Sequence, residues 1–223
     1  MTPTGNRHSE DSGAVSGTAG VCVTGRARRR TFALPGLLAV VLAAGACTSQ
    51  PTPAPDQTLG TEVYITAYTW QDNTPEGSPI ISHPVLHRTA GGTGTYQDPV
   101  TIAVGHSLET GKDVLDYQPG TRIYLPDVRR YFIVEDTCGD GDAPQDGPCH
   151  TGAKEHGTAS IWLDMWIGGE GVSARFARRC TMQVTGVLRA VFDPADNYVV
   201  APGYGVIHDG KCDAGYGNEL VTK

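Results

Sequence analysis

The carboxyl group of Asp136 ends a run of residues that alternates as a β-strand does. In RYFIVED, residues 130–136, strand parity puts Asp136 on the same face as Phe132 and Val134, where the strand ends. Cys138 and a glycine turn follow directly. Partial burial, or a second acid close by, raises the pKa of a carboxyl group and makes it a proton donor. We therefore expect Asp136 to act as a general acid.

A second acid, Asp164, stands between two tryptophans in the stretch WLDMW. Alternation places Trp162, Asp164 and Trp166 on one strand face and the residues between them on a core face. Two indoles around a carboxyl group would form an aromatic platform, which suits sugar rings with an acid at the glycosidic oxygen. The alternative is that the tryptophans pack under a loop, while Asp164 caps a turn or pairs with an arginine.

Four other residues are candidates for the same site. His106 ends TIAVGH at a strand-to-loop junction, where it could carry a proton, although on its own it is more simply a hydrogen-bonded or exposed ring. Asp72 follows the first strand and on its own is a turn residue. Tyr68 and Trp70 share one face of that strand and would offer aromatic surface to a substrate.

The loop GDGDAPQDG, residues 139–147, carries three aspartates that could bind calcium. It lacks a terminal glutamate at EF-hand spacing, so a solvated turn is favoured. We expect no metal ion and no cofactor in this protein.

Four cysteines fall in the part of the chain expected to fold. Four cysteines in an exported domain indicate two disulfides, with three possible pairings. We favour the pairing of sequence neighbours. A zinc site is the alternative, but no pair of these cysteines has the short CxxC spacing. The predicted bridges are Cys138–Cys149 and Cys180–Cys212.

The elements that must position these residues are short strands with Gly, Pro, Asp and Asn between them. Many short strands at such spacing predict an all-β barrel or sandwich. Helical spacing predicts one helix, from Val172 to about Val184. The predicted strands cover residues 62–70, 100–106, 120–126, 130–136, 160–167 and 186–192.

The N-terminal part has the pattern of an export signal. Four arginines within residues 26–30 precede an apolar run, Phe32 to Ala46, which is shorter than a membrane-spanning helix requires. The run ends in AGAC, which resembles a bacterial lipobox and makes Cys47 a lipidation site, with an ordinary cleavage site as the alternative. We predict a signal peptide over residues 1–46, a Pro-rich linker over 47–60 and one domain over 61–223.

The charge of the chain argues against nucleic acid as a partner. The net charge is -7, and because residues 1–46 carry five arginines and two acids, the remainder carries 12 basic and 22 acidic residues. A surface with that excess of acid repels phosphates.

The order of the motifs resembles that of the double-psi β-barrel superfamily over about residues 101–167, with YITAYTW in front. TIAVGH, YQPGTRIYL, FIVEDTC and WLDMW are similar, in this order, to the motifs of the rare lipoprotein A family. That likeness implies a six-stranded double-psi barrel with one short helix and disulfide-pinned loops. It also implies active-site roles for His106, Asp136 and Asp164. Membrane-bound lytic transglycosylases with a 3D domain are similar at Asp136 and Asp164.

Two further families in the superfamily lead to different functions. The sequence around Asp164 resembles the motif of the general acid in family-45 endoglucanases. The sequence around Asp72 resembles the motif of their catalytic base, with an insertion in this chain. Expansins share the barrel, the acid and the aromatics and are not established hydrolases. We therefore expect a monomeric, exported or lipid-anchored protein of the cell envelope that acts on peptidoglycan or a β-glucan. Cleavage would be by lytic transglycosylation or inverting hydrolysis. The alternatives are a non-catalytic, expansin-like polysaccharide binder and a structural lipoprotein that binds protein partners.

Overall fold

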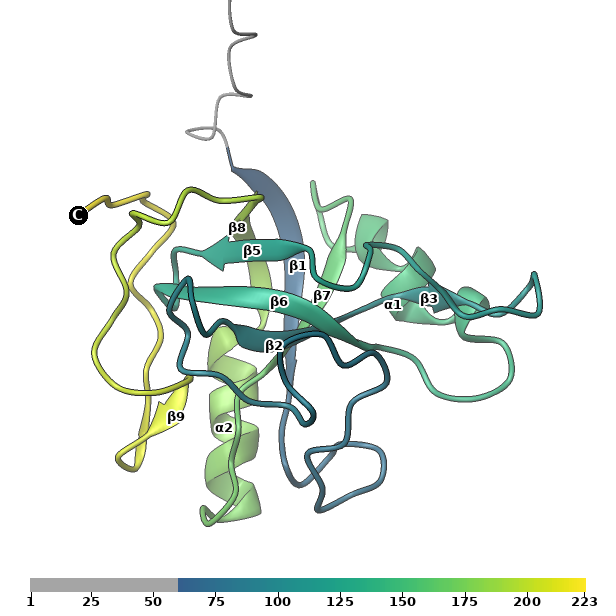
Figure 1. Ribbon diagram of the computed structural model, residues 1–223, viewed down its shortest axis with the longest axis horizontal. Coiled ribbons are helices and arrows are strands. Elements are labelled where there is room, and N and C mark those ends of the chain that lie inside the picture. Colours follow the sequence, from purple (N-terminus) through teal and green to yellow (C-terminus); the bar gives the residue numbers. More distant parts are fainter. Residues whose placement is uncertain (1–59) are drawn as a thin grey trace, which may run out of the picture. The chain divides into compact units, whose positions relative to one another are not determined.

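The fold is a mainly β structure built around one closed barrel of six strands (Figure 1). The computed structural model describes residues 60–223, so the predicted signal peptide, the linker and Cys47 lie outside the described residues. Around the barrel the strands follow the order β1-β7-β2-β6-β5-β8. Their bounds are β1 Thr61–Tyr68, β2 Val100–Val104, β5 Arg122–Leu125, β6 Arg130–Thr137, β7 Trp162–Trp166 and β8 Gly186–Phe192.

Alternation along the strands fills the barrel, as the sequence predicted. Val63, Ile65, Phe132, Leu163 and Met165 are all fully buried in one hydrophobic cluster. The residues between them point outward, which is why the polar residues of β7 lie on the outer face of the barrel.

Pairing between strands that are distant in sequence brings the two candidate acids together. β1 runs parallel to β7 and β2 parallel to β6, whereas the other pairs are antiparallel. Ala103 of β2 therefore pairs with Asp164 on one side and with Asp136 on the other. Thr66 of β1 pairs with Asp164 from the far side. The small side chain of Ala103 leaves open space between two carboxyl groups.

The predicted face of Asp136 was wrong, because β6 contains a β-bulge. Its register against β2 shifts between Val134, which pairs with Ile102, and Asp136, which pairs with Ala103, so that Glu135 is the extra residue. A bulge places two residues opposite one and reverses the alternation beyond it. Asp136 therefore lies on the outer face of the barrel, away from Phe132 and Val134.

The remaining elements surround the barrel. Helix α2 (Ala174–Val184) is capped by Ser173 and packs on β1, and the chain then enters β8, as predicted. Within residues 60–223 no helix is long and apolar enough to cross a membrane. The short elements are β3 His106–Ser107, β4 Val114–Leu115, η1 Pro144–Asp146, α1 Pro148–Thr151, η2 Ala153–Glu155, β9 Ile207–His208 and β10 Lys211–Cys212.

Two disulfides have the predicted pairing. Cys138–Cys149 joins the end of β6 to α1, and Cys180–Cys212 joins α2 to β10. The second closes a loop with a sequence separation of 32, which contributes about 3–4 kcal/mol on the chain-entropy estimate.

A buried arginine, which the sequence did not single out, holds the C-terminal segment to the barrel. The Arg130 side chain is fully buried, and its guanidinium donates to the backbone oxygens of Ala201, Pro202 and Gly205. It also pairs with Asp213 at 2.9 Å. The hydrogen bonds and the ion pair compensate for burying the charge, and they give structure to a segment with no strong pattern of its own.

Candidate functional site

A cleft of about 390 Å³ opens on the outer face of the barrel, above Ala103. Its lining comes from β1, β2, β6 and β7 and from the loops that follow β1 and β6. Four aspartates and no arginine, lysine or histidine contribute to the lining. The residues that matter below are Tyr68, Asp72, Ser82, Asp136, Asp140 and Asp164.

Asp164 is the carboxyl group of the cleft whose pKa departs clearly from the usual value of an aspartate. Burial raises its pKa to about 7, and the charges of Asp72 and Asp136 act in the same direction, while a hydrogen bond from Thr66 opposes them. A carboxyl group with this pKa is about half protonated near neutral pH, which is the property of a general acid.

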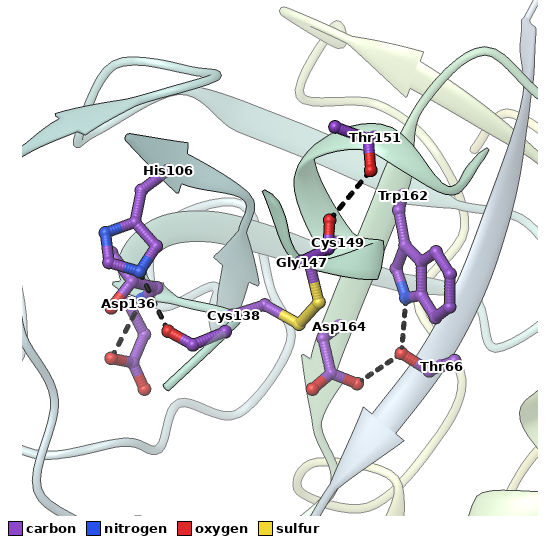
Figure 2. The surroundings of a disulfide bond; sticks show 11 residues. Thr66, His106, Asp136, Cys138, Gly147, Cys149, Thr151, Trp162 and Asp164 are labelled. Carbon is purple, nitrogen blue, oxygen red and sulfur yellow. Dashed lines mark hydrogen bonds between the residues drawn. A yellow bond between two sulfur atoms is a disulfide. The ribbon is translucent and has the colours of Figure 1, made fainter. Parts of the chain in front are cut away.

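The partners of Asp164 decide which oxygen carries that proton. The indole Nε1 of Trp162 donates to the Thr66 hydroxyl at 2.8 Å, and this hydroxyl donates to Oδ1 of Asp164 at 2.6 Å (Figure 2). Indole has only a donor to offer, so the threonine oxygen accepts and its hydrogen goes to Asp164. Since Oδ1 is then an acceptor, the proton of neutral Asp164 belongs on Oδ2.

Asp136, in contrast, is surrounded by donors. Oδ2 accepts from the Tyr68 hydroxyl at 2.9 Å, and Oδ1 accepts at 3.0 Å from the backbone of Thr137 and from both the backbone and hydroxyl of Ser82. Burial and the charge of Asp136 raise the pKa of Tyr68 well above its usual value, so the phenol keeps the proton that it donates. Asp136 is therefore arranged as an acceptor, whereas the sequence predicted a proton donor.

Asp72 combines its predicted turn role with a place in the cleft. Oδ1 accepts from the backbone and the hydroxyl of Thr69, at 2.5 Å and 2.6 Å. These bonds close the turn after β1 and hold the carboxylate on the same side as Asp164.

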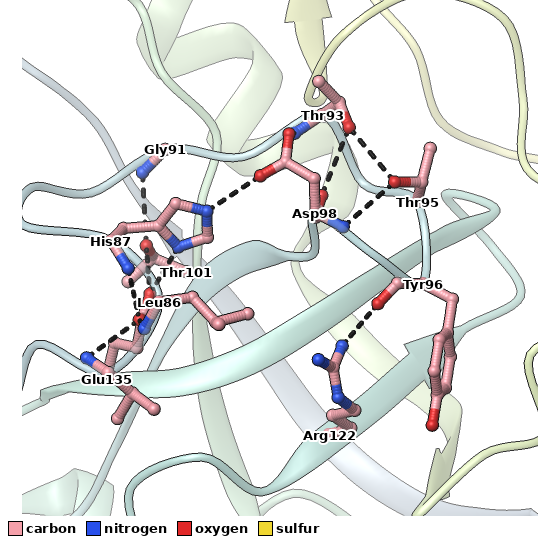
Figure 3. A network of polar contacts seen from close by, with 11 residues as sticks. Leu86, His87, Gly91, Thr93, Thr95, Tyr96, Asp98, Thr101, Arg122 and Glu135 are labelled. Carbon is pink, nitrogen blue, oxygen red and sulfur yellow. Dashed lines mark hydrogen bonds and ion pairs between the residues drawn. The ribbon is translucent and has the colours of Figure 1, made fainter.

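Glu135, the extra residue of the bulge, anchors the loop that forms one wall of the cleft. Its fully buried Oε1 accepts from three successive backbone N–H groups, at 3.1, 2.5 and 2.9 Å (Figure 3). Burial opposes ionisation, but bonds from His87 and Leu86 outweigh it and lower the pKa of Glu135. The donors belong to Val85, Leu86 and His87.

The imidazole of His87 completes this anchor by bridging two acids. Nδ1 lies 2.7 Å from Glu135 and Nε2 lies 2.9 Å from Asp98. Burial works against the charged ring, but the bonds to Asp98 and Glu135 prevail and raise the pKa of His87. The loop thus contacts Asp136 through Ser82. It contacts Glu135 through Val85, Leu86 and His87.

His106 does not line the cleft, in contrast to the predicted role. Its ring lies beside the end of β6 (Figure 2). The ring is buried, with Nδ1 at 2.6 Å from Asp113 and Nε2 at 2.9 Å from the backbone oxygen of Gly139. Both ring nitrogens are thus occupied. The histidine holds the loop that carries Asp140, so its role here is to position the cleft wall.

The predicted aromatic platform is not formed. Trp166 is only 6% exposed and meets the Tyr68 ring edge to face. Trp70 packs partly buried against the hydrophobic core. Trp162 lies against Tyr64 and borders a different pocket. Tyr68 is the aromatic residue of the cleft, and its hydroxyl is used by Asp136.

Sequence reasoning missed the residues that orient the acids, chiefly Thr66, Ser82 and Thr69. Thr66 lies on the predicted face of the first strand but carries no motif, and Ser82 lies in a loop without periodicity. Within residues 60–223 no group of three or more His, Cys, Asp or Glu side chains is placed to hold a metal ion.

Replacing Glu135 should loosen the cleft wall. In Glu135→Gln the charge that the three amides share is lost, and an NH2 group faces the His87 ring. We expect hydrogen exchange at Val85, Leu86 and His87 to speed up roughly tenfold or more. Glu62→Gln, at an exposed position of β1, serves as the control. Unchanged exchange at all three amides would contradict the anchoring role.

Replacing Asp164 should change how stability depends on pH. Its folded pKa of about 7 lies above the usual value, so the stability from the bound proton is complete below pH 4 and lost as pH rises through about 7. Asp164→Asn removes this loss, so relative to wild type it should gain about 2–4 kcal/mol between pH 4 and pH 8. Denaturant unfolding at both pH values measures the gain, and parallel profiles would refute the raised pKa.

Comparison with known proteins identifies a family for this fold. Residues 60–213 match the family described as the DDB_G0273701 N-terminal domain. A Dictyostelium discoideum relative, Uncharacterized protein DDB_G0273701/DDB_G0273221, is 30% identical over 138 residues, or 61% of this chain and 52% of the relative. The chain thus spans about half the length of that relative, and no solved structure matches. The family match begins where the described fold begins, and the chain belongs to the DDB_G0273701 N-terminal domain family.

Proposed function

We propose that this protein cleaves glycosidic bonds of a polysaccharide in the cleft, with Asp164 as general acid. The observation that carries the proposal is the carboxyl group of Asp164, with a pKa of about 7, in an open cleft beside two further aspartates. Glycosidic cleavage needs a carboxyl group that is still protonated near neutral pH and reaches the leaving oxygen. Oδ2 of Asp164 carries that proton.

The fold proposed for this chemistry is a double-psi barrel. Two observations support it: the order of the sequence motifs, and the two parallel pairs, β1 with β7 and β2 with β6, within an otherwise antiparallel barrel. This type of barrel brings strand ends together at a groove.

The proposal gives Asp136 a different role from the one expected from sequence. With four donors at its oxygens, Asp136 acts as a fixed negative charge. Burial is the main cause of the raised pKa of Asp164, and the charge of Asp136 adds to it; the same charge would stabilise the positive charge that develops on the sugar ring. Asp136 thus supports catalysis without giving up a proton.

Asp72 is the candidate base. It lines the same cleft, and its charge raises the pKa of Asp164. If Asp72 activates a water, the reaction is inverting hydrolysis, for which carboxyl groups stand roughly 6.5–9.5 Å apart. If a substrate hydroxyl attacks in place of water, the product is an anhydro sugar, as in lytic transglycosylation. Mass analysis of soluble products separates the two outcomes.

An expansin-like binder, the main alternative, has less support. Such a binder needs an exposed aromatic face, yet Trp166 is buried and the tryptophans do not form a platform. It also has no use for an acid with a raised pKa. The structural-lipoprotein alternative leaves the open acidic cleft without a role.

The general acid can be tested directly. Asp164→Asn keeps the acceptor for Thr66 but has no proton to donate, so cleavage of the susceptible polymer should fall about 10²–10⁴-fold. The wild-type rate should decline as pH rises through about 7, because the protonated form is lost. Peptidoglycan, cellulose and other β-glucans are the polymers to incubate.

Asp142→Asn is the matched control, since Asp142 is an exposed aspartate of the loop after β6 that does not line the cleft. It should stay close to wild type. Equal activity of Asp164→Asn and wild type would remove Asp164 from the mechanism. Binding without cleavage by the wild type on every polymer would favour the expansin-like alternative.

Export and lipid anchoring complete the proposal, and they are supported by the sequence around Cys47. Cys47→Ser lacks the thiol that would carry the lipid, so it should lose membrane association or remain unprocessed. Fractionation of cells that express wild type and variant measures this. If the variant fractionates with membranes as the wild type does, another feature holds the protein there.

A further inference from the structure

A second, smaller pocket lies beside the cleft and has no role in the chemistry above. Its volume is about 250 Å³, and its lining includes Asp116, Tyr117, Cys149, His150 and Trp162. Two aromatic side chains thus border the same space as a histidine and a carboxylate.

The polar part of this pocket is a histidine–aspartate pair. Nδ1 of His150 lies 2.6 Å from Oδ1 of Asp116, and the two side chains are 32% and 27% exposed. The neutral ring therefore carries its proton on Nδ1, which leaves Nε2 as an acceptor. Nε2 makes no hydrogen bond within residues 60–223 and is available to a ligand.

Gly105 allows this pair to form. A Cβ atom at this position would lie 2.4 Å from Oδ2 of Asp116 and 2.7 Å from Cα of His150. Only a glycine lets α1 approach the end of β2 so closely, which brings the histidine over the carboxylate.

The pocket and the cleft are neighbours along one face of the barrel. Cys138 lines the cleft and its disulfide partner Cys149 lines the pocket, so the bridge stands between the two (Figure 2). Trp162 of the pocket and Asp164 of the cleft lie on the same side of β7, two residues and therefore roughly 7 Å apart. That spacing is on the scale of one sugar ring.

We propose that the pocket between Asp116, His150 and Trp162 is a subsite that binds an uncharged sugar unit of the polymer cleaved at Asp164. This inference rests on the proposed function and adds the substrate class. Aromatic side chains suit the apolar face of a sugar ring, and Nε2 together with the carboxylate accepts hydrogen bonds from its hydroxyl groups.

The charge of the surroundings excludes acidic polymers. The pocket contributes Asp116 and the cleft four aspartates, with no arginine or lysine in either lining. A uronic acid or a phosphorylated sugar would be repelled by the ionised carboxylates among them, since no arginine or lysine of the lining offsets their charge. Neutral hexose or N-acetylhexosamine units are the substrates that this surface accepts.

Oligosaccharide binding to an Asp164→Asn protein, which cannot cleave, tests the subsite. The probes are cellohexaose and chitohexaose, followed by the NMR signals of the Trp162 indole and the His150 ring. One of the probes should shift both signals. Adding His150→Ala or Asp116→Asn should weaken its binding roughly tenfold, which is the loss of one hydrogen bond to a charged or polar partner.

Asp209→Asn is the matched control, because Asp209 forms a histidine–aspartate pair with His208 in the β9–β10 turn. It should leave binding unchanged.

Shifts confined to the cleft, equal affinity in the His150→Ala protein, or no binding of either probe would overturn the subsite. Pocket binding in a wild-type protein that cleaves neither probe nor any of the polymers named above would refute the proposed cleavage and retain the subsite. Cleavage at the wild-type rate by Asp116→Asn and His150→Ala proteins that retain Asp164 would refute the subsite and retain the proposed cleavage.

Discussion

The cleft depends on the hydrogen bonds that the fully buried carboxylate of Glu135 accepts. An isolated charge inside a protein costs several kcal/mol, and here three consecutive backbone amides and the His87 ring compensate for that cost. The same bonds fix a loop that has neither helix nor strand. Because the loop is fixed, Ser82 can donate twice to Asp136, and the cleft acquires a wall. Two adjacent acids, Glu135 and Asp136, thus both accept hydrogen bonds from the same loop and fix it.

The β-bulge makes this division possible. In a regular strand neighbouring side chains point to opposite sides, and one of the two acids would enter the apolar interior of the barrel. The extra residue lets both carboxylates face outward, toward different parts of one loop. Asp136 then faces Asp164 across Ala103, and its negative charge helps to keep Asp164 protonated. A local irregularity in one strand therefore adds a second carboxylate to the site, and its charge reinforces the effect of burial on the pKa of Asp164.

Much of the fold follows from local patterns. Strands such as β1 and β7 alternate between core and surface residues because one face is buried, and that period is visible in any short stretch. Helix α2 and strand β8 were likewise predicted from the spacing of their apolar residues. The pairing of the two disulfides agrees with the prediction from the even number of cysteines and their order along the chain. The C-terminal segment is different, because the side chain of a distant arginine, Arg130, holds it.

For the candidate site, the sequence by itself predicted three acids that all reach one cleft, Asp136 and Asp164 on strands and Asp72 in the turn after β1. It did not determine their roles. The tertiary structure decided that Asp164, bonded through Thr66, has the raised pKa, that Asp136 is an acceptor, and that the tryptophans do not form a platform. The physical reason is that residue type and period are properties of short segments. A pKa depends on burial and on charges that the fold brings together from distant parts of the chain.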